Sequence, residues 1–162
     1  TTQAKDDPIE YVHGELGYNY RLTNLQAALG VAQLEQLSDF IADKRRIAQR
    51  YRETLTALPG ISMPEEAAWA ESTWWLSTIS IDATTFRSDS RTLLQRLLDR
   101  KIQCRPLWQP MHRSPVHANA FAYRIEHADR IHQEALSLPC SAGMTREEQN
   151  RVIEAIRDAA PR

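Results

Sequence analysis

The stretch GYNYRLTNLQAALG, residues 17–30, decides how this chain begins to fold and carries its most specific chemistry. Thr23 and Gln26 have the spacing of a capping box, in which the hydroxyl and the amide side chain each bond a free backbone N–H at the beginning of a helix. Asn19 and Arg21, just before this cap, can both donate hydrogen bonds to phosphate, and a helix N-terminus favours anions. From these residues alone, the stretch predicts either a phosphate site or an ordinary cap with an exposed arginine.

Downstream of this cap, apolar residues recur at helical spacing from Leu25 to Leu58 and stop at Pro59-Gly60. The pattern predicts a helix of roughly 35 residues, longer than is usual in a globular protein. We therefore expect a kink or a break near Ser38-Asp39. The charged section Asp43–Arg46 is expected to face solvent.

After Pro59 the pattern changes to short elements in the order β-α-β-α-β-α, which predicts a small α/β lobe with helices packed on a sheet. Trp75 is expected in the core of this lobe. The expected elements are a strand over 74–81, a helix over 91–100, a strand over 102–108 that Pro106 places at an edge, a loop over 110–119, a helix over 120–134, a strand over 136–138, and a last helix that opens at a second capping box, Thr145 with Glu148.

The composition is that of an ordinary globular protein, with 162 residues, 42% hydrophobic and 25% charged, and a net charge of -1. We expect no nucleic-acid partner, no membrane span and no metal site. The cysteines Cys104 and Cys140 are predicted to be two buried thiols in a reducing cytosol. The chain opens TTQAKDDP, without a signal peptide or an initiating Met, which reads as the middle of a longer chain or a trimmed one.

Four segments together resemble one enzyme family. GYNYRLTNLQAA resembles the hallmark of the DegT/DnrJ/EryC1/StrS family, and TWWL (73–76), RPLWQPMH (105–112) and SLPC (137–140) resemble further family segments in the same order. The resemblance implies homodimeric sugar aminotransferases with shared active sites, which use pyridoxal 5'-phosphate and have the fold-type I, aspartate aminotransferase-like fold. Residues 1–60 would end the large cofactor domain and form a long linking helix, and residues 61–162 would form the small C-terminal α/β domain.

The resemblance also implies roles for four residues. Asn19 would reach the cofactor phosphate across the dimer interface, and Arg21 would lie at the same site, near phosphate or substrate. His112 and Arg105 would contact the nucleotide-sugar substrate. Two alternatives stay open from the residues themselves: His112 could instead pack on Trp108, and Arg105 could be part of a surface or structural ion pair.

The chemistry of such an enzyme needs a Lys that forms a Schiff base with the cofactor, usually with an acidic partner for the ring nitrogen. The lysines Lys5, Lys44 and Lys101 all lack the family's context for that residue, so we expect no catalytic residue in this chain. The chain is therefore interpreted as a C-terminal fragment of a cytoplasmic enzyme. Its full-length form would transfer an amino group from glutamate, the amino-acid donor, to the C4 or C3 ketone of a nucleotide-linked deoxy sugar, for surface polysaccharide or glycoconjugate synthesis. The segments look most like the branch acting on UDP-linked 4-keto-6-deoxy-N-acetyl sugars.

A different interpretation is a non-catalytic dimerisation or regulatory α/β module derived from that family. The visible absorption of bound pyridoxal phosphate distinguishes the two, because a module would not recover cofactor chemistry when an N-terminal half is supplied.

Overall fold

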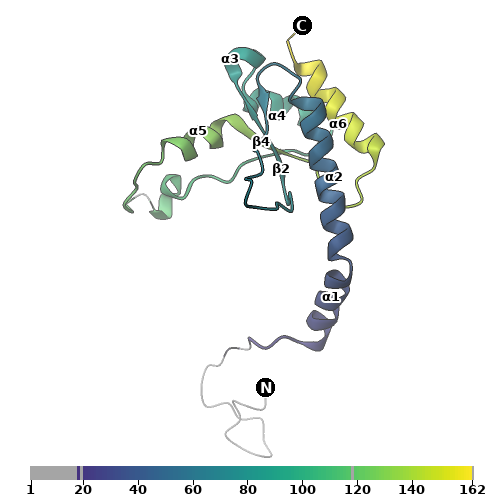
Figure 1. Cartoon of the computed structure of the whole chain (residues 1–162). Helices are drawn as coiled ribbons and strands as arrows, with labels where there is room; N and C mark the ends of the chain where they lie inside the picture. The colour runs from purple at the N-terminus through teal and green to yellow at the C-terminus, as the bar shows by residue number, and fades with distance from the viewer. Residues whose placement is uncertain (1–17, 19, 118, 162) are drawn as a thin grey trace, which may run out of the picture. The chain divides into compact units, whose positions relative to one another are not determined.

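The computed structural model describes residues 18, 20–117 and 119–161. The chain divides into two units, Thr1–Leu37 and Ser38–Arg162, and each is considered by itself. The boundary expected at residue 60, between the large cofactor domain and the small C-terminal domain of a longer enzyme, stays a prediction. The elements, labelled in Figure 1, are α1 (Asn24–Glu35), α2 (Leu37–Leu55), β1 (Ile61–Ser62), β2 (Ser77–Ile81), α3 (Ala83–Phe86), α4 (Ser90–Asp99), β3 (Arg105–Pro106), the 3-10 turns η2 (Met111–Arg113) and η3 (Pro115–His117), α5 (Glu126–Glu134), β4 (Ala135–Leu138) and α6 (Arg146–Ala159).

Helix α1 begins at the predicted capping box. The Thr23 N–H donates to Gln26 Oε1 at 3.0 Å, and the Gln26 N–H donates to Thr23 Oγ1 at 3.3 Å. The helix ends at Glu35, and Gln36 separates it from α2. The predicted interruption of the long helix is thus confirmed, two residues before its expected place at Ser38.

The buried face of α2 anchors the second unit. Ile47, Tyr51 and Leu55 recur every four residues and are fully buried, so they share one face of the helix. They belong to one apolar core with residues of the sheet, α4 and α6. Helix α6 lies beside α2 (Figure 1), where the buried Gln149 donates from Nε2 to the Ile47 carbonyl at 2.8 Å. The second capping box is confirmed as well, because Thr145 and Glu148 bond each other's backbone at the beginning of α6.

The sheet has four strands in the order β1-β2-β4-β3, and every neighbouring pair is antiparallel. In the central pair, Ser77 lies opposite Leu138 and Ile79 opposite Leu136. Alternation along β2 buries Ser77, Ile79 and Ile81 on one face, as expected for a strand covered on that side. Strand β3 is an edge strand, as Pro106 predicted.

Several predicted elements are shorter than expected. The strand expected over 74–81 begins only at Ser77, and the strand expected over 102–108 is reduced to Arg105–Pro106. The helix expected over 120–134 begins at Glu126. Trp75 had suggested strand but is exposed and precedes β2, whereas Ile102 and Cys104 are buried in the core although they lie outside β3. The short elements β1 and α3 were not predicted.

The turn that ends the α2 region depends on Gly60. Its φ is +78°, which favours glycine, and a Cβ at this position would lie 2.6 Å from the backbone N of Phe86. The Gly60 carbonyl also accepts from the Asp82 N–H at 2.8 Å. The Pro59-Gly60 stop in the sequence is therefore a close backbone approach between two segments.

Both cysteines are free and buried. Burial raises the pKa of the Cys104 thiol to about 12, so this thiol stays protonated at neutral pH. The prediction of two buried thiols is confirmed.

We expect Tyr51→Phe to lower the free energy of unfolding by about 1 kcal/mol, because the Tyr51 hydroxyl donates to the Pro139 carbonyl at 2.8 Å. Burial also raises the pKa of Tyr51 above its ordinary value of 10.0. The unfolded chain therefore loses this proton first, and stability falls as the pH rises through that value. Urea titrations from pH 8 to 11 should give a shallower decline for the variant; an equal decline would contradict this account of Tyr51.

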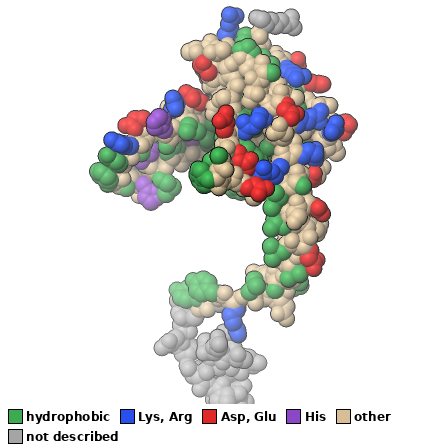
Figure 2. Space-filling model, viewed as in Figure 1, with side chains coloured by type: hydrophobic (Ala, Val, Ile, Leu, Met, Phe, Trp, Pro, Cys, Tyr) green, Lys and Arg blue, Asp and Glu red, His purple; other side chains and the backbone are tan. Residues whose placement is uncertain are grey.

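We expect the chain to self-associate through α1. None of the residues of α1 is buried, and Leu25, Leu29 and Leu34 are all exposed; Figure 2 shows hydrophobic side chains along this helix. Contiguous exposed apolar surface favours association. Light scattering should show a smaller mass for a Leu25→Gln, Leu29→Gln variant, whereas Leu98→Gln on α4, also an exposed leucine, should change nothing. A monodisperse monomer for the unaltered chain would refute this.

Candidate functional site

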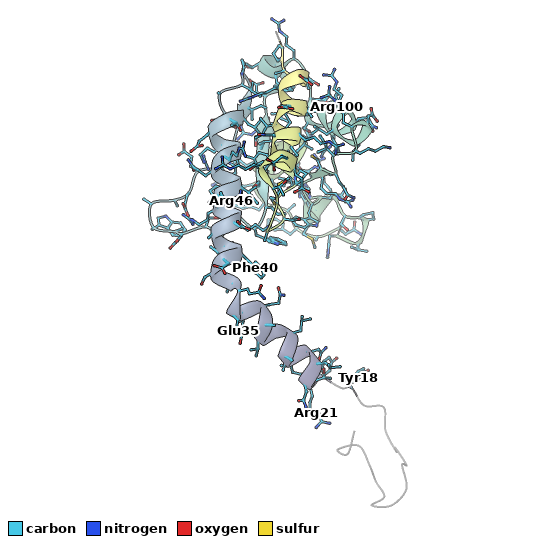
Figure 3. All side chains as sticks on the ribbon, turned by 90° about the vertical axis from the view of Figure 1, so that its right-hand side faces the viewer. Tyr18, Arg21, Glu35, Phe40, Arg46 and Arg100 are labelled. Atoms are coloured by element: carbon cyan, nitrogen blue, oxygen red, sulfur yellow. The ribbon has the colours of Figure 1, made fainter. Side chains whose placement is uncertain are left out.

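The predicted phosphate-binding residues lie at the beginning of α1. Arg21 is exposed and precedes the N-cap Thr23 by two residues (Figure 3). The rings of Tyr18 and Tyr20 stack with their centroids 6.0 Å apart. Asn19 lies outside the described residues. The described part of this stretch combines a guanidinium with a helix N-terminus, two groups that attract an anion.

The two predicted substrate residues belong to the second unit. Arg105 lies on the edge strand β3, opposite Ser137, and its side chain is exposed. No ion pair of Arg105 is seen among the described residues, so its proposed structural ion pair gains no support there. His112 lies on η2, seven positions further along the chain, and makes its contacts with α5.

His112 and Arg113 meet the carboxylate of Asp129 on α5. His112 Nε2 lies 2.9 Å from Asp129 Oδ1, and Arg113 Nε lies 2.7 Å from the same oxygen. Burial alone would raise the pKa of Asp129, but Arg113 and His112 outweigh it and hold the pKa below its ordinary value. Figure 2 shows histidine side chains gathered over this region. Asp129 was not singled out from the sequence, because its role depends on a contact with a loop 16 positions away.

Trp108 packs on Trp75. Their rings stack with centroids 5.9 Å apart and an interplanar angle of 17°. Trp75 is 66% exposed and Trp108 69% exposed, so the prediction of Trp75 in the core is wrong. The reason is that Trp75 lies two residues before β2, where the chain has not yet entered the sheet. The pair forms an exposed aromatic surface.

The charged section of α2 is partly exposed to solvent, as expected, and also makes specific contacts. Lys44 Nζ donates to the Trp75 carbonyl at 2.9 Å and lies 3.7 Å from Cys140 Sγ. Asp43 accepts from the Gly143 N–H at 2.8 Å, which is the main cause of the lowered pKa of this carboxyl, with a further contribution from Arg46. Such contacts cannot be predicted from a run of four charged residues, because their partners lie far along the chain.

Arg45, in the same section, fixes the segment that precedes β2. Its guanidinium binds Glu66 in a two-pronged contact at 3.1 Å for each nitrogen, and also donates to the Ser72 carbonyl. Glu66 in turn accepts from the Ser72 N–H, which lowers the pKa of Glu66 more than Arg45 does. Nearby, Arg52 lies over the ring of Trp74, 5.2 Å from its centroid. These groups border a hollow of about 610 Å³ along α2.

Two further features concern residues 18, 20–117 and 119–161. Within these ranges, no three His, Cys, Asp or Glu side chains gather in a way that could hold a metal ion. No helix in the described part of the chain has the length and apolar character needed to cross a membrane.

Comparison with known proteins gives consistent matches. The sequence model of the DegT/DnrJ/EryC1/StrS aminotransferase family matches residues 2–157. EpsN of Bacillus subtilis (strain 168), named as a pyridoxal phosphate-dependent aminotransferase, is 36% identical over 159 residues, which are 96% of this chain and 40% of EpsN. GDP-perosamine synthase of Escherichia coli O157:H7 is 31% identical over 149 residues, covering 92% of this chain and 39% of the synthase.

The crystal structure of DesV from S. venezuelae superimposes with a TM-score of 0.78 at 30% identity, covering 96% of this chain and 41% of DesV. The chain therefore spans about 40% of the length of these relatives. The predicted fold class, the C-terminal portion of a fold-type I pyridoxal phosphate enzyme, is confirmed by this likeness.

Proposed function

Because the chain belongs to the DegT/DnrJ/EryC1/StrS aminotransferase family, we propose that it is the C-terminal part of an enzyme that transfers an amino group from glutamate to a ketone of a nucleotide-linked deoxy sugar. The observation that carries the proposal is the family match over residues 2–157. GDP-perosamine synthase among the relatives supports a nucleotide-linked sugar as the substrate class. The product would serve surface polysaccharide or glycoconjugate synthesis in the cytoplasm.

The residues of this chain fit the phosphate end of pyridoxal 5'-phosphate. Arg21 beside the N-terminus of α1 offers a charged donor and a favourable dipole to a phosphate dianion. Asn19 would add an amide donor. When bound, the cofactor supplies an electron sink for moving an amino group. In the homodimer, we assign Asn19 and Arg21 to the cofactor of the partner subunit.

The chain offers no lysine suited to hold the cofactor covalently among its described residues. Lys44 is engaged by the Trp75 carbonyl, next to Cys140. Lys101 is an exposed residue in the turn after α4, with a φ of +61°. Lys5 lies outside the described residues. We assign the cofactor-linking Lys to a part of the enzyme that precedes residue 1.

His112 and Arg105 are proposed to contact the nucleotide sugar. His112 is held on η2 by Asp129, at 2.9 Å, and Arg105 is an exposed cation on an edge strand. An exposed guanidinium suits a diphosphate, and a neutral histidine can accept a hydrogen bond from a sugar hydroxyl. If the chain acts by itself, the lack of a lysine suited to the cofactor among its described residues favours the alternative of a non-catalytic module.

We expect the chain alone to give no visible absorption from Lys-bound pyridoxal phosphate. Reduction with borohydride followed by mass spectrometry should find no more cofactor on Lys44 of the folded chain than on Lys44 of a urea-unfolded control. The reason is that Lys44 binds the Trp75 carbonyl in the folded chain. Supplying the N-terminal part in the same cells should restore the absorption. Stoichiometric cofactor on a lysine of the isolated chain would refute the assignment, and no absorption in the reconstituted pair would favour the module.

We expect Asn19→Ala in the full-length enzyme to weaken cofactor retention by roughly tenfold, the effect of losing a hydrogen bond to a charged group. Arg105→Ala should leave cofactor retention unchanged and weaken binding of the nucleotide sugar instead. Dialysis followed by absorption of the retained cofactor measures the first effect, and calorimetric titration the second. Equal retention by the unaltered enzyme and the Asn19 variant would reject the role of Asn19.

A further inference from the structure

The carboxylate of Asp129 gathers two consecutive side chains of η2 onto α5. Its Oδ1 lies 2.9 Å from His112 Nε2 and 2.7 Å from Arg113 Nε. Asp129 lies in the first turn of α5, so the helix holds its backbone firmly. In contrast, η2 is a single 3-10 turn whose own backbone bonds, from Arg113 to Pro110 and from Ser114 to Met111, do not reach the sheet.

Burial divides the two edges of the His112 ring. Nε2 of His112 and Oδ1 of Asp129 are both closed off from solvent, and neither has a hydrogen-bond partner of good angle, so their 2.9 Å approach is an ionic contact. The His112 side chain nevertheless keeps 18% of its surface exposed. The exposed part of the side chain therefore lies away from Nε2. The His112 side chain borders a hollow of about 420 Å³, lined also by Met111, Phe121 and Tyr123.

The charges around this contact favour a carboxylate that stays ionised. Arg113 lies on Asp129 itself, and Arg91 reaches α5 by donating to the His132 carbonyl at 2.8 Å. His132, one turn after Asp129, has its pKa lowered by burial and by Arg91 and Arg113, so it stays neutral at pH 7. Asp129 is thus a negative group beside the positive Arg113, and an imidazole N–H is attracted to it.

We propose that Asp129 is a positioning residue, which holds the proton of His112 on Nε2 and turns that edge inward, so that the opposite edge with Nδ1 meets the substrate. A carboxylate on one ring nitrogen sets both the tautomer and the orientation of a histidine. The proposal rests on the proposed function, in which His112 contacts the nucleotide sugar. The hollow beside the ring then receives the part of the substrate that Nδ1 binds.

The first measurement is the tautomer of His112 in the full-length protein labelled with ¹⁵N-histidine, with His112 assigned from a His112→Gln variant. The unaltered protein should show His112 protonated on Nε2. Asp129→Ala should give a mixture of His112 tautomers or a change in the exchange between them, and Asp129→Glu should restore the single tautomer. Asp158→Asn should have no effect, because Asp158 pairs with Arg100 on the surface. A proton on Nδ1, or an unchanged pattern in Asp129→Ala, would overturn the proposal.

The second measurement is the binding of UDP-N-acetylglucosamine as a probe of the nucleotide-sugar site. Asp129→Ala and His112→Gln should each weaken binding of the probe by about tenfold. The double variant should bind the probe no more weakly than either single variant, because both residues act through one ring. If Asp129→Ala fails to fold, Asp129→Leu, which has a similar size and no hydrogen-bond acceptor, serves in both measurements. Additive losses would overturn the proposal.

The two measurements also distinguish this proposal from the proposed function. In one outcome, Asp129→Ala changes the tautomer of His112 as expected, but His112→Gln binds the probe as well as the unaltered protein does. This would reject His112 as a substrate contact and leave the hold of Asp129 on the ring intact. Loss of probe binding without any tautomer response would do the reverse, because His112 would then act without help from Asp129.

Discussion

The structure depends on the packing of α2, because this helix touches the core with one face and the loops with another. Its buried residues Ile47, Tyr51 and Leu55 fill the space beside β2, β4 and α6. Apolar burial of this kind is the main favourable term in folding. With that face fixed, the positions of Lys44 and Arg45 on the helix follow, and the carbonyls of Trp75 and Ser72 find their partners there.

The segments without regular structure are held mainly by charged side chains on neighbouring helices. Glu66 and Arg45 fasten the segment before β2, Asp43 fastens the turn at Gly143, and Asp129 fastens η2. Such contacts give direction to side chains that packing alone would leave mobile. The apolar core thus supplies stability, and ionic contacts place the loops.

Local signals predicted the parts of the fold that depend on neighbouring residues. Both capping boxes and the Pro59-Gly60 stop were found from the sequence because each involves residues within four positions. The exposure of Trp75 and the role of Asp129 could not be predicted, because both depend on segments far along the chain. The family resemblance supplied Asn19, Arg21, Arg105 and His112, which periodicity alone leaves ambiguous, and their roles stay predictions.

The single helical turn Asp43–Arg46 has a mechanical consequence. It makes contacts with the turn at Gly143, the carbonyl of Trp75 and the segment at Ser72. A slide or rotation of α2 by a fraction of a turn would break all three sets of contacts together. These loops therefore belong to one cooperative opening unit, whose amides should exchange with solvent in a correlated way.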